Sequence, residues 1–226
     1  MSNKVLEILK KESFTREEII RLLSVQTEVE KNLIFEKAAE VREKHIGKTI
    51  ALRGLIEYSN TCSKNCLYCG IRSGNPLGSR YCLNEEEVLS CSKYAYDQNY
   101  GSVVIQSGER SDKHFVNSID NLIRRIKKLS NGELGITLSC GEQTEETYRR
   151  WFESGAHRYL LRIESSNEEL YYRIHPQDVN HDFNKRLLAL NHLKSAGYQV
   201  GSGVMVGLPF QTDENLADDL LFLQKI

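Results

Sequence analysis

The stretch "TIALRGLIEYSNTCSKNCLYCG", residues 49–70, joins a β-rich run to a loop that carries three cysteines. Branched and apolar side chains dominate the first half, which predicts a strand that ends in a polar loop at residue 60. Cys62, Cys66 and Cys69 follow within eight consecutive positions, with no fourth cysteine beside them. Three thiols at the exit of a strand predict a site for a soft metal, because thiolates select zinc or an iron-sulfur cluster.

The chain after this loop repeats one pattern, a short apolar run followed by an amphipathic stretch. Strands are predicted at "SVVIQSG", "LGITLSCG", "RYLLRIESS" and "VGSGVMVGLP", with helices between them that often end in glycine. Such alternation predicts right-handed βαβ units and a parallel sheet, so the fold class is α/β. A complete barrel of eight units needs about 250 residues. We therefore predict an incomplete TIM-like barrel of about five βα units over residues 49–226, with the fifth strand as an open edge.

The segment before the first strand has helical periodicity. Its first apolar face consists of Val5, Leu6, Ile8 and Leu9. Thr15 and Glu18 have the spacing of a capping box and predict the start of a second helix. We predict two parts of the chain, a helical extension over residues 1–48 and the partial barrel over residues 49–226.

Composition excludes several classes of function. The 226 residues carry 30 basic and 31 acidic side chains, so no strong net charge attracts nucleic acid or an anionic membrane. No apolar run approaches the roughly 18 residues that a membrane span needs, and the first residues do not resemble a secretory signal. We expect a cytoplasmic protein without nucleic-acid or membrane partners. Its six cysteines are then reduced, and either free or bound to a metal.

The missing fourth ligand separates the two kinds of metal site. Structural zinc needs a closed tetrahedron, whereas a [4Fe-4S] cluster held by three cysteines leaves one iron open for a group that is not protein. Cys82 could close a zinc site, but "RYCLNEEEV" predicts the entry to a helix with Asn84 as its N-cap. We interpret Cys82 and Cys91 as helix-face or core thiols. The cluster is the favoured prediction, and a zinc-stabilised, non-catalytic scaffold is the alternative.

The C-x3-C-x2-C spacing, with Tyr68 directly before the last cysteine, resembles the cluster loop of radical S-adenosylmethionine (SAM) enzymes. The resemblance implies that Cys62, Cys66 and Cys69 hold a [4Fe-4S] cluster and that Tyr68 lies near the cofactors. In this family the open iron binds the amino and carboxylate groups of SAM. A reducing electron donor then drives cleavage of SAM to a 5′-deoxyadenosyl radical, which acts on a small-molecule substrate.

The same resemblance assigns SAM contacts to the ends of the second and third strands. Ser107, Gly108 and Glu109 resemble the family's glycine-glutamate motif, which faces the methionine ammonium; the alternative is an ordinary turn with a solvent-facing glutamate. Glu142 follows the third strand and is a candidate acceptor for the ribose or the ammonium. It could equally be an acid favoured by a helix N-terminus.

The fourth and fifth strands supply the remaining candidates. Arg162 and Glu164 are two positions apart and therefore share the interior face of the predicted sheet. Arg162 is a candidate to bind the SAM carboxylate, and a structural Arg162–Glu164 pair is the alternative. Val206, Gly207 and Leu208 are candidates to line the adenine, or else belong to an ordinary buried strand.

Longer stretches, among them "IEYSNTCSKNCLYCGIRSGN", "VVIQSGE" and "MVGLPFQTDENLADDLLFL", resemble the HydE family of [FeFe]-hydrogenase maturases. That resemblance implies an organometallic substrate, a role in assembly of the hydrogenase active-site cluster, and other hydrogenase maturases as partners. Methylornithine synthase and biotin synthase are related alternatives, and an inactive fragment is another.

Three features depart from the HydE pattern, and one of them is Cys140, which stands where that family usually has an apolar residue. His175 stands where that family usually has arginine, and the loop that leads to "FNKRLL" is longer. His175 and Arg53 are the substrate candidates. For Arg53, on the first strand, a salt-bridged pair with Glu57 is the alternative, and for His175 the alternative is a hydrogen bond within its loop.

Overall fold

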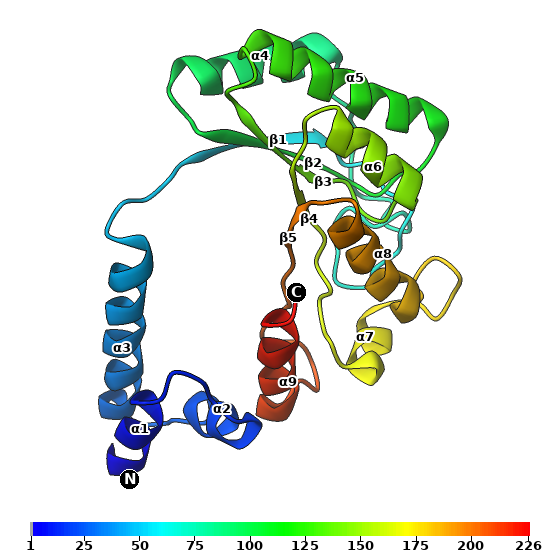
Figure 1. The fold of residues 1–226 in the computed structure, drawn as a ribbon. Coiled ribbons are helices and arrows are strands. Elements are labelled where there is room, and N and C mark those ends of the chain that lie inside the picture. The colour runs from blue at the N-terminus through cyan, green and yellow to red at the C-terminus, as the bar shows by residue number, and fades with distance from the viewer. Residues whose placement is uncertain (1) are drawn as a thin grey trace. The chain divides into compact units, whose positions relative to one another are not determined.

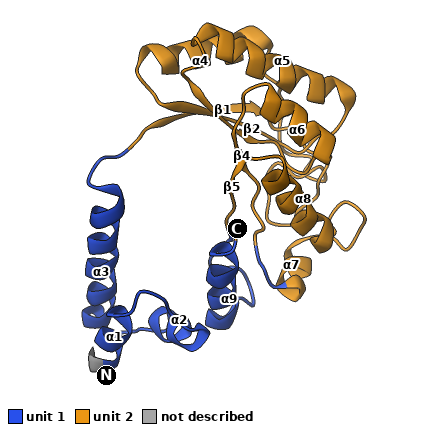
Figure 2. Cartoon of the chain, viewed as in Figure 1, with its two compact units in different colours: residues 1–50, 165–167, 204–225 blue, residues 51–164, 168–203, 226 orange. Residues whose placement is uncertain are grey.

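The protein is described here by a computed structural model that covers residues 2–226. The chain divides into two compact units, shown in Figure 2. The first unit contains the N-terminal helices up to residue 50 together with residues 165–167 and 204–225. The second unit contains residues 51–164 and 168–203, and it holds the sheet and the three-cysteine loop.

The second unit is built on a parallel sheet with strand order β1-β2-β3-β4-β5. The strands are β1 (Arg53–Ser59), β2 (Ser102–Ser107), β3 (Gly135–Ser139), β4 (Arg158–Leu160) and β5 (Gln199–Gly201). The helices between them are α4 (Glu85–Asp97), α5 (Lys113–Leu129), α6 (Glu145–Glu153), α7 (Glu168–Ile174) and α8 (Phe183–Ser195). This architecture confirms the incomplete α/β barrel. The short α7 was not predicted from the sequence.

The two faces of the sheet differ in burial. Ile56, Ile105 and Leu138 are aligned on neighbouring strands and are almost fully buried. Helices α4, α5, α6 and α8 lie along one side of the sheet in Figure 1. Glu57 and Gln106 are also aligned with each other, but they are exposed on the opposite face. In the described part of the chain these helices therefore cover one face of the sheet, and Glu57 lies on the other face, which corresponds to a barrel interior.

Helix α5 shows how the covered face is formed. Asp112 caps its first turn through a hydrogen bond to the backbone N–H of Phe115, and Lys127 and Lys128 lie in its last turn. Its apolar positions recur at helical spacing and are at most 1% exposed: Phe115, Ile119, Leu122, Ile123 and Ile126. This continuous apolar stripe fixes which side of α5 faces the rest of the unit.

Strands β4 and β5 are shorter than predicted, because the backbone ladder becomes irregular after Leu160. The N–H of Ile163 is bonded by the side-chain Oγ of Ser202 at 3.2 Å instead of by a backbone carbonyl. Glu164 then adopts a left-handed conformation with φ +67°. Residues 161–164 still follow the neighbouring segment, since the N–H of Glu164 donates to the Gly203 carbonyl at 3.0 Å.

The first unit contains α1 (Ser2–Leu9), α2 (Arg16–Leu23), α3 (Glu28–Ile46) and α9 (Asp213–Leu223). Val5, Leu9 and Val25 form its small buried core, whereas Leu6, predicted on the same face, is 40% exposed. The capping box of Thr15 is confirmed.

Helix α9 belongs to the first unit. Arg16 Nε lies 2.6 Å from Asp218 Oδ1, so α2 is paired with α9. Residues 204–225, which we predicted as part of the barrel, therefore form one compact unit with the N-terminal helices. Within residues 2–226, no helix is both long and apolar enough to cross a membrane.

Candidate functional site

The three cysteines lie on the loop that leaves the carboxyl end of β1, here called the cysteine loop (residues 59–75). Cys66 is buried, and Cys62 and Cys69 are half-buried. A tight turn joins two of them, because the N–H of Cys69 donates to the carbonyl of Cys66 at 3.0 Å. The guanidinium of Arg80 closes the loop from outside through hydrogen bonds of 2.7 Å to three of its carbonyls, those of Asn60, Ile71 and Arg72.

The end of β2 is fitted closely against this loop. A Cβ added at Gly108 would lie 2.4 Å from the carbonyl oxygen of Thr61, so no other residue fits there without displacement. The N–H of Glu109 donates to Cys62 Sγ at 3.3 Å, and the Glu109 carbonyl accepts from both the N–H and the Oγ of Ser63 at 2.9 Å. The "QSGE" turn is therefore a support for the cysteine loop, and not an ordinary solvent-facing turn.

Four buried charges converge behind the loop, and we call Lys64, Glu109, Glu142 and Arg186 the charge cluster. Lys64 Nζ lies 3.2 Å from Glu109 Oε1 and 3.0 Å from Glu142 Oε2. Arg186 Nε lies 2.5 Å from Glu142 Oε1, an ion pair without the alignment of a hydrogen bond, and its NH2 group lies 3.8 Å from Glu109 Oε2. Two cations thus balance two carboxylates away from water.

Burial and neighbouring charges shift the pKa of two members of the charge cluster, Glu109 and Arg186. Burial raises the pKa of Glu109, while Arg186 and Lys64 oppose this shift. Burial by itself lowers the pKa of Arg186, but Glu142 and Glu109 raise it above its ordinary value. Glu109 and Glu142 were predicted from the sequence as SAM contacts, but their two cationic partners were missed. Only Lys64 could have been suspected from the sequence, because it lies between the expected ligands Cys62 and Cys66. Arg186 lies 117 positions after Cys69, so no local pattern connects it with the site.

The segment after β4 brings Arg162 and Glu164 together, as predicted. Their closest atoms, Arg162 Nε and Glu164 Oε1, are 3.7 Å apart. The Arg162 side chain is about half exposed, whereas Glu164 is buried and its Oε2 has no hydrogen-bond partner. Burial raises the pKa of Glu164. A buried carboxylate oxygen without a donor next to an accessible guanidinium is an arrangement that can accept a polar ligand.

The predicted adenine contacts lie outside this unit. Val206, Gly207 and Leu208 belong to the first unit, where Val206 is exposed and Leu208 is buried. The side chain of Gln211 accepts a hydrogen bond from the N–H of Gly207 at 2.7 Å. A contact of these residues with adenine stays a prediction.

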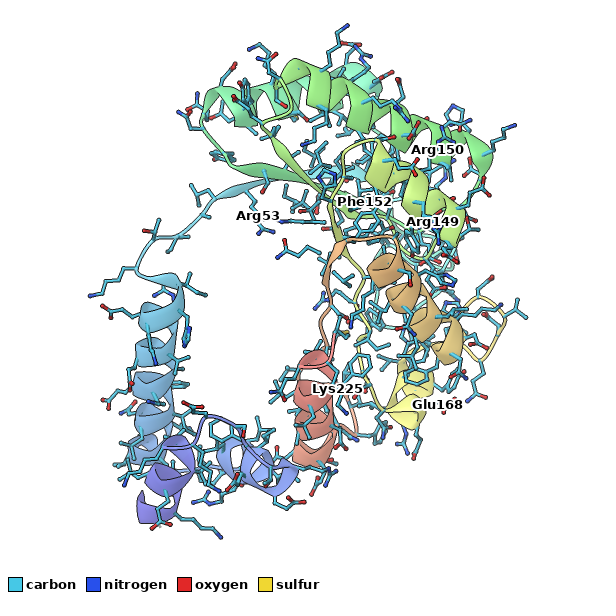
Figure 3. The ribbon with its side chains drawn as sticks, viewed as in Figure 1. Arg53, Arg149, Arg150, Phe152, Glu168 and Lys225 are labelled. Carbon is cyan, nitrogen blue, oxygen red and sulfur yellow. The ribbon has the colours of Figure 1, made fainter. Side chains whose placement is uncertain are left out.

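The two substrate candidates lie at different places in the second unit, and a contact of either with substrate stays a prediction. Arg53 begins β1, six residues before the strand reaches the cysteine loop, and is thus about 20 Å from it along the strand (Figure 3). His175 is only 2% exposed. Its Nδ1–H donates to the Tyr171 carbonyl at 2.8 Å, which leaves Nε2 as an acceptor for the hydroxyl of Tyr68, 3.3 Å away. His175 therefore holds the cysteine loop through its hydrogen bond with Tyr68.

The other cysteines do not join the three on the loop. Cys91 is exposed on α4, and Cys140 is fully buried after β3. Cys82 is exposed and pairs with Ser59 as an isolated bridge, so our assignment of it as a helix-face or core thiol was wrong. The polar entry to α4 placed it at the surface, where Asn84 forms the predicted cap.

The donor set of the loop fits an iron-sulfur cluster. Within residues 2–226, no group of three or more His, Cys, Asp or Glu side chains is close enough to hold a single metal ion. A lone zinc ion would need thiolates about 2.3 Å from its centre, whereas a cube of irons holds its thiolates farther apart. Burial raises the pKa of Cys62 and raises that of Cys66 to about 11; Cys69 adds to the first shift, and Cys62 and Cys69 add to the second. Ligation of Cys62 and Cys66 would therefore release protons from these thiols.

Comparison with known proteins identifies this arrangement. Residues 56–223 match the family described as the radical SAM superfamily. The chain belongs to the radical SAM superfamily. Enzymes of this superfamily use a [4Fe-4S] cluster and SAM, which confirms the two predicted cofactors. The matched span contains the cysteine loop and the charge cluster, together with Arg162 and Glu164.

Three known relatives are each similar to this chain over most of its length. The [FeFe] hydrogenase maturase subunit HydE of Thermotoga maritima is 40% identical over 98% of this chain and 62% of that protein. The 3-methylornithine synthase of Methanosarcina acetivorans is 26% identical over 83% of this chain and 52% of that protein. A crystal structure of HydG, a maturase of the [FeFe]-hydrogenase, has a TM-score of 0.86 and 28% identity, covering 100% of this chain and 51% of that one. The chain thus spans only part of the length of each relative.

Proposed function

We propose that the protein is a radical SAM enzyme that holds a [4Fe-4S] cluster on Cys62, Cys66 and Cys69 and cleaves SAM reductively. The observation that carries this proposal is the cysteine loop itself. It presents three thiols at the carboxyl edge of a parallel sheet, where (β/α) folds place their chemistry. When bound, the cluster supplies the electron that breaks a carbon–sulfur bond of SAM.

The protein's own side chains bind and orient SAM in this proposal. The guanidinium of Arg162 is accessible, and its planar shape allows two parallel hydrogen bonds to the SAM carboxylate. The free Oε2 of Glu164 accepts a hydrogen bond from the ammonium or the ribose. Glu109 and Glu142 are already paired with Lys64 and Arg186, so we assign them to holding the loop in place. This assignment differs from the direct SAM contacts that the sequence resemblance suggested.

We further propose that the whole protein acts as a HydE-like maturase in assembly of the [FeFe]-hydrogenase active-site cluster. The 40% identity with HydE over nearly the whole chain supports this role. An organometallic substrate, a reducing electron donor and other hydrogenase maturases as partners follow from it. A methylornithine synthase-like reaction on a small molecule is the second candidate, because that relative also matches most of the chain.

Anaerobic reconstitution tests the radical SAM activity. The chain is loaded with iron and sulfide, reduced with dithionite and incubated with SAM. We expect a brown protein with about four irons per chain and release of 5′-deoxyadenosine. The variant C62S/C66S/C69S should lose both the iron and the product. The matched control C82S/C91S changes two exposed cysteines outside the loop and should retain both. A colourless wild-type protein that binds zinc would contradict the proposal.

The maturase role has a separate test. A cell-free hydrogenase maturation mixture that lacks HydE is supplemented with the reconstituted protein, and hydrogen evolution is measured. Restored evolution, abolished in C62S/C66S/C69S, is the expected result. A protein that cleaves SAM but does not restore maturation would remove the HydE-like role and leave the radical SAM activity intact. Formation of 3-methylornithine would then support the second candidate.

A further inference from the structure

The residues on both sides of Cys66 are all held by one other segment of the second unit. This segment, residues 174–181, joins α7 to α8, and we call it the latch. The N–H of Leu67 donates to the carbonyl of Ile174 at 3.0 Å, and the hydroxyl of Tyr68 contacts His175. Lys64 and Asn65 contact the other end of the latch, at Asn180 and His181. Cys66 itself is 9% exposed and lies between these contacts.

His181 makes the contact nearest to Cys66. The backbone N–H of Asn65 donates to His181 Nε2 at 2.9 Å, so this nitrogen carries no proton. The other ring nitrogen, Nδ1, therefore bears the proton and donates it to Asp178 Oδ1 at 2.6 Å. His181 is 1% exposed, whereas Asp178 is 46% exposed at its side chain. The Asp178 carboxylate thus fixes the imidazole tautomer that can accept from Asn65.

Lys64 ties the latch to the sheet. Its ammonium donates to the carbonyl of Asn180 in the latch and to Glu142, and it forms an ion pair with Glu109. Glu109 follows β2 and Glu142 follows β3, so one buried side chain connects two strand ends to the latch. The side chain of Lys64 is only 7% exposed, and these acceptors match the donors that an ammonium group carries.

His175 completes the set and links the latch to the aromatic residue of the cysteine loop. Its ring stacks on Tyr171 with a centroid distance of 3.9 Å and meets the Tyr68 ring edge-on at 5.4 Å. Two of the three features by which this sequence departs from the HydE pattern, His175 and the longer loop before α8, lie in or beside the latch, whereas Cys140 follows β3. Both features therefore lie at the segment that holds the cysteine loop.

We propose that the latch is a positioning element for the cluster ligand Cys66, and that His181, oriented by Asp178, is its principal positioning residue. The latch holds the backbone of residues 64–68 in the conformation that presents the Cys66 thiol. This inference rests on the proposed function only in taking Cys66 as a cluster ligand. In the structure His181 is hydrogen-bonded to the N–H of Asn65 and to Asp178.

The test uses the full chain and two measurements. Hydrogen–deuterium exchange of the metal-free protein reports protection of the amides in residues 59–75, and bleaching of the reconstituted cluster by an iron chelator reports its lifetime. We expect His181→Ala to speed exchange at Asn65 and its neighbours about tenfold, the effect of one lost buried hydrogen bond, and to shorten the cluster lifetime severalfold. His192→Ala, on α8 but outside the latch, should change neither measurement.

A conservative variant separates positioning from general stability. In His181→Gln the amide oxygen can still accept from the N–H of Asn65, so at least half of the lost protection should return. Should His181→Ala fail to fold, Asp178→Asn carries the same test, because Asp178 is accessible and its loss leaves the imidazole tautomer unfixed. About threefold faster exchange is expected there.

The outcomes distinguish this inference from the proposed function. Wild-type exchange rates and cluster lifetimes in folded His181→Ala, or in Asp178→Asn, would overturn the role of the latch. Equal losses in His181→Gln and His181→Ala would also contradict it, because the acceptor for Asn65 would then be irrelevant. The exchange measurement needs no cluster. A wild-type protein that fails to cleave SAM would therefore refute the proposed function, whereas the exchange rates would still test the role of the latch.

Discussion

The second unit buries two contrasting sets of side chains. The helix-covered side of its sheet encloses rings and aliphatic groups, such as Trp151 and Tyr148, which are fully buried. The carboxyl edge of the same sheet encloses the charge cluster, in which Lys64 and Arg186 are each less than 10% exposed. Apolar burial stabilises a fold in proportion to the area removed from water, whereas buried ion pairs contribute little net stability but strongly penalise the loss of one partner.

The two regions therefore contribute differently to the fold. The apolar side supplies most of the free energy of folding, and the charged edge determines where the cysteine loop lies relative to β2, β3 and α8. Both regions can therefore be disturbed separately, and each should respond in a different measurement.

The largest effect is expected from the apolar side. Trp151 is fully buried, packs edge-on against Phe115, and donates from Nε1 to the Val116 carbonyl at 3.1 Å. Trp151→Ala should lower the free energy of unfolding by about 4 kcal/mol, through lost apolar burial and a cavity. Chemical denaturation measures this change. Trp151→Phe, which fills most of the volume, should cost clearly less, and equal losses in both would contradict the cavity argument.

The charge cluster should show a smaller loss with strong coupling. Arg186→Met leaves Glu109 and Glu142 short of a counter-charge and should cost about 3 kcal/mol of unfolding free energy. Glu142→Gln in the same chain removes the unpaired charge, so the double variant should lose less than the sum of the two single variants. Additive losses within about 0.5 kcal/mol would show that the two side chains do not act as a pair.

The pH dependence of stability should reveal His175. Burial lowers its pKa to about 4, from an ordinary value of 6.5, so the folded protein keeps this imidazole neutral. As the pH falls from 6.5 towards 4, the unfolded chain gains a proton that the folded chain does not bind, and stability decreases. His175 should account for about 2 kcal/mol of the loss between pH 7 and pH 5.

The control for that measurement is His175→Phe, which removes the titrating group. Its unfolding free energy should fall less steeply with pH over the same window, whatever its absolute stability. An unchanged slope would mean that His175 is accessible to protons in the folded state.

The smallest effect is expected from an exposed counterpart of Arg186. Arg125 on α5 lies 2.9 Å from both Glu85 and Glu86 at the protein surface. Arg125→Ala should leave the unfolding free energy almost unchanged, because water solvates the released carboxylates. A loss as large as that of Arg186→Met would erase the distinction between buried and exposed ion pairs on which the comparison depends.

Local patterns in the sequence predicted the elements of the fold well. The stripe of α5, the caps at Thr15 and Asn84 and the order of the five strands all follow from spacing between near neighbours. The lengths of β4 and β5 did not, because their ladder ends where Ser202 replaces a backbone acceptor, and that contact joins residues 39 positions apart. The short α7 was also missed, although its buried residues Leu170, Tyr171 and Ile174 have helical spacing.

For the site, the sequence by itself determined the ligands. Three thiols within eight positions can act together whatever the rest of the chain does, because a short loop keeps them close. Only the tertiary structure decided what holds them: Lys64 and Arg186 meet the two glutamates, and His181 meets Asn65 across 116 positions. Buried polar groups must find partners wherever the fold provides them, and no local spacing encodes which partner that is.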